Sequence, residues 1–122
     1  IPSLEQFENI ILFFETSEEI PSAEYVSKVL ELLGDRGILT SIKGVLVGRP
    51  KAWQFDIQKT TQEKEEYRRK QSIAVLDTIR KYNKSVPIIQ NMDFGHTDPQ
   101  IPLPNGRVIR INSLDKRIYA EF

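Results

Sequence analysis

His96 is the only histidine in this 122-residue chain. Its side chain is the one best suited to proton transfer near neutral pH. It lies in residues 93–100, a turn rich in Asp, Gly and Pro that follows the apolar run 86–89. A loop at the end of a buried strand is a common place for a reactive side chain. We therefore consider His96 a candidate general base, with an ordinary structural or solvent-exposed histidine as the alternative.

A histidine base becomes effective when a carboxylate binds its other ring nitrogen and stabilises the imidazolium. The sequence offers several candidates for that carboxylate: Glu15, Glu18, Glu19, Asp93 and Asp98. Asp93 and Asp98 are close to His96 in sequence, but the direction of their side chains is unknown at this level. Glu15 is better placed because it directly follows the apolar run 9–14. Residue types and spacing alone leave this choice open.

Other motifs in the chain carry no chemistry. Residues 93–95 match the Asp-Phe-Gly magnesium motif of kinases by letters alone, because the accompanying lysine strand and catalytic loop are absent. Gly44 and Gly48 lack the spacing of a phosphate loop, so we expect them to permit close backbone packing and a turn. No Gly-x-Ser-x-Gly elbow occurs, and so no serine is marked as a nucleophile.

Composition limits the class of protein further. Lys plus Arg and Asp plus Glu number 17 each, which gives no support to a nucleic-acid or membrane-surface partner. The absence of cysteine excludes disulfides and thiolate metal sites and suits a reducing compartment, so we expect a cytoplasmic protein. A single histidine makes a histidine-based zinc site improbable, and we expect neither a metal nor a cofactor.

The elements that must position His96 follow from the hydrophobic pattern. Residues 9–14 and 42–47 are apolar runs typical of strands in an α/β sheet, the first buried on both faces. A helix is expected to begin after Ser22 as N-cap and to stop at Gly34 and Gly37. Its predicted core face comprises Tyr25, Val26, Val29, Leu30, Leu32 and Leu33. Trp53 lies in an irregular stretch, where its ring either closes the edge of the core or lines a cleft.

The second half of the chain contains the longest helix and a β-rich end. Residues 60–83 are predicted to be helical, with the pairs Glu65–Arg69 and Glu66–Lys70 on the exposed half. The half expected to dock on the sheet carries Val75, Leu76, Ile79 and Tyr82. Residues 101–104 are extended and cannot form a central strand because of their prolines. After the Asn105-Gly106 turn, residues 107–122 predict an antiparallel meander, giving about six short strands and two helices in one domain.

Four blocks of the sequence resemble the C-terminal domain of the LD-carboxypeptidases (muramoyltetrapeptide carboxypeptidases). These blocks are residues 11–22, 44–49, 93–100 and 103–106, and they occur in the family's order. The family consists of serine peptidases and includes the microcin C self-immunity proteins. The resemblance implies an α/β fold of the swivelling β/β/α kind, with a small mixed sheet or barrel, two main helices and a C-terminal antiparallel meander.

The resemblance also implies a Ser-Glu-His triad divided between two domains. The N-terminal domain of the family carries the serine and the oxyanion hole, and Glu15 and His96 match the glutamate and the histidine of the C-terminal domain. The segment 59–72 and the stretch around Trp53 are more similar to the immunity branch, which cleaves an amide in peptidyl- or aminoacyl-nucleotide antibiotics.

On this basis we expect residues 1–122 to be the C-terminal catalytic-support domain of a longer two-domain enzyme. The start at Ile1 without a methionine fits a piece of a longer protein. Its partners would be the N-terminal nucleophile domain and a peptide or peptidyl-nucleotide substrate. The whole protein would be a homodimer without nucleic-acid or membrane partners, and the chain alone would be inactive.

Two functions of other classes stay open at this level. One is a swivelling phosphocarrier domain with His96 as the phosphoryl acceptor, although such a domain would need a basic phosphate cradle and the turn offers Asp93 and Asp98. The other is a non-catalytic interaction module in which His96 has no special role.

Overall fold

A three-stranded parallel sheet organises the chain, and its strands are β1 (Ile11–Phe14), β2 (Gly44–Gly48) and β3 (Ile88–Met92) in the order β1-β2-β3. The computed structural model describes residues 3–16, 19–52, 58–96 and 101–122. The connection from β1 to β2 contains α2 (Ala23–Asp35) and the short α3 (Ile38–Ser41), and the connection from β2 to β3 contains α4 (Thr61–Tyr82). A further short helix, α1 (Leu4–Phe7), precedes β1.

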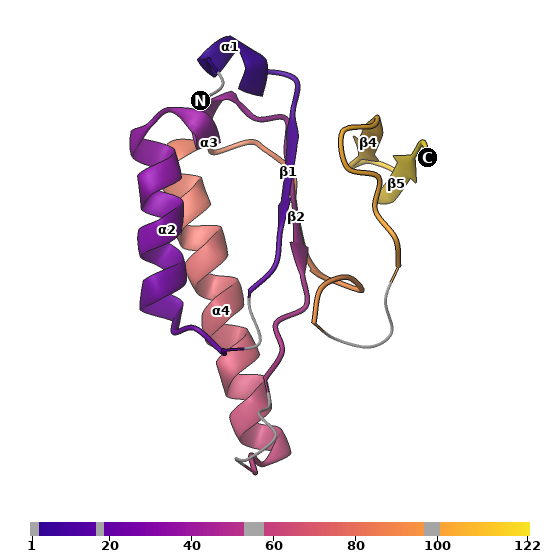
Figure 1. The fold of residues 1–122 in the computed structure, drawn as a ribbon. Coiled ribbons are helices and arrows are strands. Elements are labelled where there is room, and N and C mark those ends of the chain that lie inside the picture. The colour runs from indigo at the N-terminus through magenta and orange to yellow at the C-terminus, as the bar shows by residue number, and fades with distance from the viewer. Residues whose placement is uncertain (1–2, 17–18, 53–57, 97–100) are drawn as a thin grey trace.

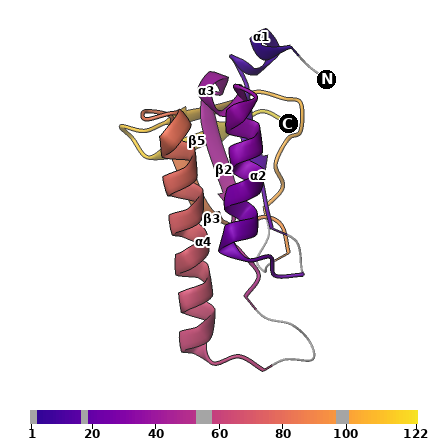
Figure 2. The same cartoon turned by 90° about the vertical axis from the view of Figure 1, so that its left-hand side faces the viewer.

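Both long helices cover the same face of the sheet (Figures 1 and 2). Both crossovers step in the same direction along the strand order, and crossovers between parallel strands are right-handed. The helices must therefore lie side by side on one face, which leaves the other face to be covered by something else.

The C-terminal hairpin lies on that other face of the sheet (Figure 1). It consists of β4 (Ile109–Asn112) and β5 (Arg117–Ala120), which pair antiparallel with Ile109 opposite Ala120. Gly44 of β2 permits the close approach, because a Cβ atom there would lie 2.6 Å from Cδ1 of Ile111. The predicted fold class, with two main helices and a C-terminal antiparallel pair, is confirmed. The five strands of the described residues divide between two separate sheets.

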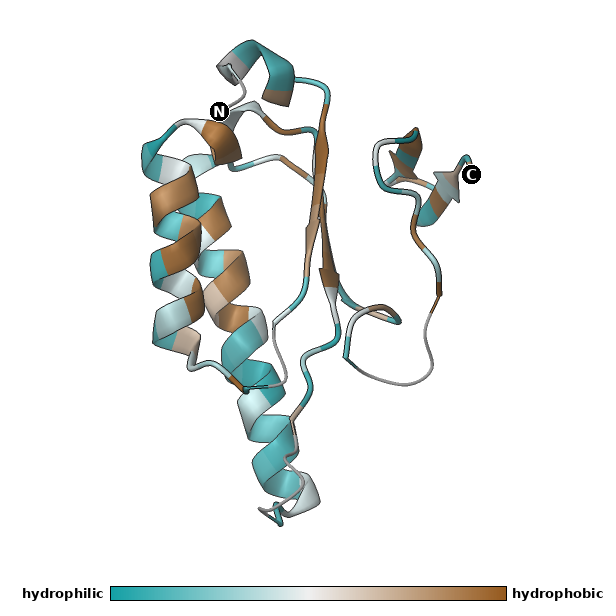
Figure 3. Ribbon diagram, viewed as in Figure 1, coloured by the Kyte–Doolittle hydropathy of each residue, from teal (hydrophilic) through white to brown (hydrophobic). Residues whose placement is uncertain are grey.

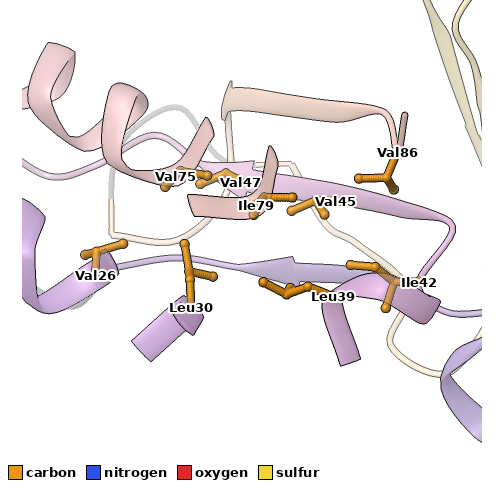
Figure 4. Packing of buried hydrophobic residues seen from close by; sticks show 9 residues of the cluster. All are labelled: Val26, Leu30, Leu39, Ile42, Val45, Val47, Val75, Ile79 and Val86. Atoms are coloured by element: carbon orange, nitrogen blue, oxygen red, sulfur yellow. The ribbon is translucent and has the colours of Figure 1, made fainter. Parts of the chain in front are cut away.

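The hydrophobic core lies between the helices and the sheet (Figure 4). It comprises Val26, Leu30, Leu39, Ile42, Val45, Val47, Val75, Ile79 and Val86. The central strand β2 is buried along its whole length, whereas β1 is only half-buried. The expectation that residues 9–14 form a strand buried on both faces is therefore wrong, because β1 is an edge strand of the parallel sheet and has β2 as its partner.

Helix α2 presents a narrower apolar stripe to the core than the sequence predicts. Ser22 caps the helix as expected, since its Oγ accepts a hydrogen bond of 3.1 Å from the Tyr25 N–H. Val26 and Leu30 are buried, and Leu33 packs against the core. The other three predicted core residues are exposed: Tyr25, Val29 and Leu32. Residues spaced at i, i+4 and i+7 share one face, and the exposed three lie to the side of that face.

Gly34 does not end this helix, contrary to the prediction. It lies inside α2, where the ring of Tyr82 from α4 packs so closely that a Cβ atom would overlap it. The helix ends at Asp35, and Gly37 follows with a left-handed φ of 82°. Gly34 therefore serves helix packing, and the positive φ that ends many helices falls on Gly37.

Helix α4 begins and ends where the sequence predicts. Its N-cap Thr60 accepts a hydrogen bond of 3.1 Å from the Glu63 N–H, and Asn83 is the C-cap. Val75 and Ile79 are buried, but the predicted core residue Leu76 is 42% exposed. The N-terminal half of the helix is hydrophilic and extends beyond the sheet (Figure 3).

One of the two predicted charge pairs on the exposed half of α4 differs in the structure, whereas Lys70 interacts electrostatically with Glu66 as predicted. Arg69 pairs with Glu66, three residues earlier, at 2.6 Å, and not with Glu65 as predicted. Trp53 lies outside the described residues, so both alternatives for its ring stay predictions. Within the described residues, no helix combines the length and the apolar character needed to cross a lipid bilayer.

Candidate active site

Glu15 and His96 meet at the carboxyl edge of the parallel sheet. Glu15 directly follows β1, and His96 lies four residues after the end of β3. The Nδ1 atom of His96 lies 2.8 Å from Oε2 of Glu15. The two side chains are 42% and 34% exposed, so the pair is open to solvent on one side. The structure thus brings together the two residues that the family resemblance matches to the histidine base and its orienting carboxylate.

A β-bulge redirects the chain that carries His96. Leu46 of β2 pairs with Ile89, but Gly48 pairs with Met92, so β3 contains one extra residue between these pairs. Asn91 adopts a left-handed φ of 58° at this point. Bulges of this kind commonly re-aim side chains next to active sites, and Asn tolerates the left-handed conformation better than most residues.

The loop after β3 crosses the end of β2 to reach β1, because β1 and β3 are not neighbours in the sheet. Gly48 at the end of β2 leaves room for this crossing: a Cβ atom there would lie 2.6 Å from the carbonyl oxygen of Phe94. The buried ring of Phe94 then packs edge-on against Phe13 of β1, with 6.1 Å between the ring centroids. This aromatic contact connects β1 to the loop after β3. Phe13 lies two residues before Glu15, and Phe94 lies two residues before His96.

Gly95 is required at its position for two reasons. Its φ is 97°, a conformation that side chains with a Cβ atom rarely adopt. A Cβ atom at this position would also overlap Oε2 of Glu15, the oxygen that binds His96. The Gly95-His96 sequence therefore lets the carboxylate lie directly against the backbone of the loop.

The geometry sets the protonation pattern of the His96 ring. An ionised carboxylate can only accept hydrogen bonds, so Nδ1 of the neutral ring must carry the proton, and this Nδ1–H donates a hydrogen bond to Glu15. The lone pair on Nε2 is then free to accept a proton from another group. An imidazole oriented in this way can act as a general base, and the carboxylate stabilises the imidazolium that forms.

The other candidate carboxylates have different positions. Asp93 pairs with Arg49, whose Nη2 lies 2.5 Å from its Oδ1. Glu19 is exposed in the turn that follows Glu15. Glu18 and Asp98 lie outside the described residues. Among the residues that the structure describes, no three His, Cys, Asp or Glu side chains gather in a group that could hold a metal ion.

Several residues that shape the site were not identified from the sequence. Arg49 and Phe94 lie in the blocks 44–49 and 93–100 that resemble the family, but no role was predicted for either side chain. Asn91 offered a usable signal, because Asn within a predicted strand suggests a bulge or a left-handed residue. No pattern in the sequence indicates that Arg49 and Asp93 are partners.

Comparisons with known proteins agree with this fold. The family described as "LD-carboxypeptidase C-terminal domain" matches residues 1–111. A protein of Treponema pallidum (strain Nichols) named "Putative carboxypeptidase" is 31% identical over 102 residues, which are 84% of this chain and 26% of that protein. The crystal structure of an MccF-like protein from Streptococcus pneumoniae in complex with AMP superposes with a TM-score of 0.76 and 32% identity, covering 99% of this chain and 31% of that one.

The fold and the site define a class of protein: an α/β domain that holds a carboxylate and an imidazole in contact at the carboxyl edge of a parallel sheet. The chain belongs to the LD-carboxypeptidase C-terminal domain family and has the fold of the MccF-like proteins. It spans about a quarter of the length of the curated relative and about a third of the solved one.

Proposed function

We propose that this chain supplies the glutamate and the histidine of a Ser-Glu-His triad in a serine carboxypeptidase. The observation that carries the proposal is the contact of 2.8 Å between Nδ1 of His96 and Oε2 of Glu15. The pair has the geometry that a histidine base and its orienting carboxylate need, and it lies in a family of carboxypeptidases.

In the proposed mechanism, His96 moves the protons of an acyl transfer. Nε2 of His96 takes the proton of a serine hydroxyl while the serine oxygen attacks the carbonyl carbon of the scissile amide. The imidazolium then gives this proton to the departing amine nitrogen, and the acyl group stays on the serine as an ester. In the deacylation that follows, a water molecule gives its proton to Nε2 and attacks the ester carbon. The imidazolium then returns a proton to the serine oxygen, and the carboxylic acid product is released. Glu15 remains ionised throughout, orienting the ring and stabilising its positive charge.

We expect the serine of the triad to lie outside this chain, because the sequence contains no Gly-x-Ser-x-Gly elbow. We propose that the chain is the C-terminal domain of a longer two-domain enzyme whose N-terminal domain carries the nucleophile and the oxyanion hole. The MccF-like protein of Streptococcus pneumoniae is about three times as long as this chain, which is consistent with a second domain. The proposal includes a cytoplasmic, homodimeric whole protein.

The proposed substrate is an amide in a murein peptide or in a peptidyl- or aminoacyl-nucleotide. The structural relative was crystallised with AMP, which favours the nucleotide-linked substrates. Comparing the kcat/KM values for an LD-linked tetrapeptide and for an aminoacyl-sulfamoyl adenosine distinguishes the two branches.

The experiment that tests the function uses the full-length protein that contains this chain. We expect Glu15→Gln and His96→Ala each to lower kcat by roughly 10⁴-fold or more, because triad members act together. Glu121→Gln makes the same chemical change at an exposed position near the C-terminus and should keep the activity of the parent protein. Retention of activity by His96→Ala would rule out the proposed triad.

A phosphocarrier role has less support from the site. A phosphoryl group on Nδ1 of His96 would lie beside the carboxylate of Glu15, whose negative charge repels it, and the nearby cation Arg49 is already paired with Asp93. Incubation with a phosphoryl donor, followed by intact mass measurement, separates this function from the peptidase: the peptidase proposal predicts no mass increase.

A further inference from the structure

Arg49 lies at the same edge of the sheet as the proposed acid and base, directly after β2. Its backbone N–H donates a hydrogen bond of 2.8 Å to the carbonyl of Met92, and its Nη2 lies 2.5 Å from Oδ1 of Asp93. Arg49 thus contacts the start of the His96 loop twice, once through its backbone and once through its side chain.

The side-chain contact is not the only interaction that holds the loop. The backbone at Asp93 is also fixed by two hydrogen bonds, from Phe94 N–H to the Met92 carbonyl at 2.9 Å and from Ile101 N–H to the Asp93 carbonyl at 2.5 Å. Although 32% of the Arg49 side chain and 37% of the Asp93 side chain are accessible, the Oδ1 atom of Asp93 that faces Arg49 is itself buried. A buried carboxylate oxygen is costly without a compensating charge, so the guanidinium of Arg49 holds this oxygen in its buried position.

That position matters because Asp93 is only three residues from His96 and is the nearest carboxylate in the described part of the loop. A carboxylate released there could accept a hydrogen bond from Nε2–H of His96 and favour the opposite tautomer, in which Nε2 has no lone pair to act as a base. An Asp93 carboxylate released from Arg49 could then compete with Glu15 for the ring.

We infer that Arg49 is a positioning residue, which holds the Asp93 carboxylate away from His96 and so leaves the ring to be oriented by Glu15. The inference rests on the proposed function for its consequence in catalysis, but its structural content concerns the tautomer of His96 and can be measured without any substrate.

The test uses the ¹⁵N-labelled 122-residue chain, whose single histidine gives one imidazole in a long-range ¹H–¹⁵N spectrum. In the parent chain, at a pH where the ring is neutral, we expect a protonated Nδ1 and an unprotonated Nε2. In Arg49→Met the two ring nitrogen signals should move toward each other, as they do when the Nε2–H tautomer becomes populated. Arg49→Lys should restore much of the parent pattern, because it keeps a cation beside Asp93.

Two further variants distinguish positioning from a general structural effect. Asp93→Asn introduced into Arg49→Met should restore the parent signals, because the competing carboxylate is gone. Arg110→Met removes an arginine from the C-terminal hairpin, where it stacks over Tyr119, and should leave the His96 signals unchanged. Far-ultraviolet circular dichroism and the melting temperature serve to verify that each variant is folded.

The inference is overturned if Arg49→Met leaves the ring signals of the parent, if Asp93→Asn fails to restore them, or if Arg110→Met moves them equally. In the full-length enzyme, Arg49→Met should lower kcat by between about tenfold and a hundredfold with KM unchanged, since it misplaces a catalytic group without contacting the substrate. If Glu15→Gln and His96→Ala leave the enzyme active, the proposed function fails, and the spectra still decide the role of Arg49.

Discussion

At the scale of single residues, Gly95 and Gly106 form a natural pair for an experiment. Both have a positive φ, 97° for Gly95 and 73° for Gly106. A Cβ atom at Gly95 would overlap the carboxylate of Glu15, whereas one at Gly106 would meet nothing within 4 Å. The two positions therefore separate the cost of backbone strain from the cost of disturbing the site.

We expect Gly106→Ala to lower the free energy of unfolding by about 1–2 kcal/mol through strain alone. Gly95→Ala should incur the same strain and also displace Glu15 from His96. Urea denaturation of both variants measures the stability, and the ¹⁵N signals of the His96 ring report the contact. A Gly95→Ala variant that keeps the parent ring signals would contradict the described geometry.

The alkaline behaviour of Tyr67 gives a second prediction at this scale. Its hydroxyl donates a hydrogen bond of 2.7 Å to the Pro21 carbonyl, and burial raises the pKa of Tyr67 to about 12. In the unfolded chain a tyrosine ionises near pH ~10. The protonated form is thus favoured in the folded state. Its stabilising contribution is complete below pH ~10 and is lost as the pH rises toward ~12.

Urea denaturation across this range should therefore show a decline in stability that is smaller in Tyr67→Phe. A hydrogen bond to Asp35 raises the pKa of Tyr82 as well, so part of the decline should remain in the variant. The same variant measured near neutral pH isolates the loss of the Pro21 hydrogen bond, which we expect to be about 1 kcal/mol. Parallel pH curves for the parent and Tyr67→Phe would be the contrary result.

At the scale of elements, the two faces of α4 test how the helix docks. Ile79 is fully buried and Leu76 is 42% exposed, although the sequence places both on the predicted core face. We expect Ile79→Ala to cost about 2–5 kcal/mol of unfolding free energy, because it leaves a cavity in the core. Leu76→Ala should cost about 1 kcal/mol or less. Thermal and urea unfolding of the two variants check this, and equal losses would mean that the helix docks through a wider face.

The extent of α4 could be predicted from the sequence because its signals are local. Thr60 as N-cap and Asn83 as C-cap act within one turn of the helix, and the apolar spacing repeats over several turns. Which apolar residues reach the core could not be predicted, because this depends on the distance and angle between α4 and the sheet. The exposed Leu76 of α4, like the exposed Leu32 of α2, results from that packing geometry.

The candidate site shows the same division between local and non-local information. That Glu15 and His96 lie at one edge follows from strand polarity, since parallel strands end on the same side of a sheet. The structure pairs Asp93 with Arg49 and has a bulge in β3 before the loop that carries His96, and both features bear on which carboxylate meets the ring. Both involve segments that are far apart in the sequence, and neither produces a periodic pattern of residue types from which it could be predicted.

The shape of the whole molecule explains why the Glu15–His96 pair is exposed. Helices cover one face of the sheet and the C-terminal hairpin lies on the other, while Glu15 and His96 remain at the open carboxyl edge, about one-third to two-fifths exposed. A half-exposed imidazole whose Nε2 has no hydrogen-bond partner among the described residues suits a surface that a second domain closes, since exclusion of water strengthens the interactions of a triad.

The last prediction follows from this arrangement: the purified 122-residue chain should fold but should not hydrolyse LD-linked peptides or aminoacyl-nucleotides. The chain offers a base and its orienting carboxylate without a nucleophile elbow, and a base alone lacks the covalent step and the oxyanion stabilisation that supply most of the rate. Circular dichroism and a cooperative melting curve establish that the chain is folded. The full-length protein, assayed beside it with the same substrates, shows that the assay detects turnover.

A complementation experiment tests the same prediction in the positive direction: the proposed N-terminal domain is expressed separately and added to the 122-residue chain. If the two parts associate, activity should appear only in the mixture, and the His96→Ala chain should fail to restore it. Turnover by the 122-residue chain alone that is lost in His96→Ala would contradict the divided site, because the nucleophile would then have to lie within these residues. A nucleophile within the chain would call for a search among its own serines, none of which lies in a Gly-x-Ser-x-Gly elbow.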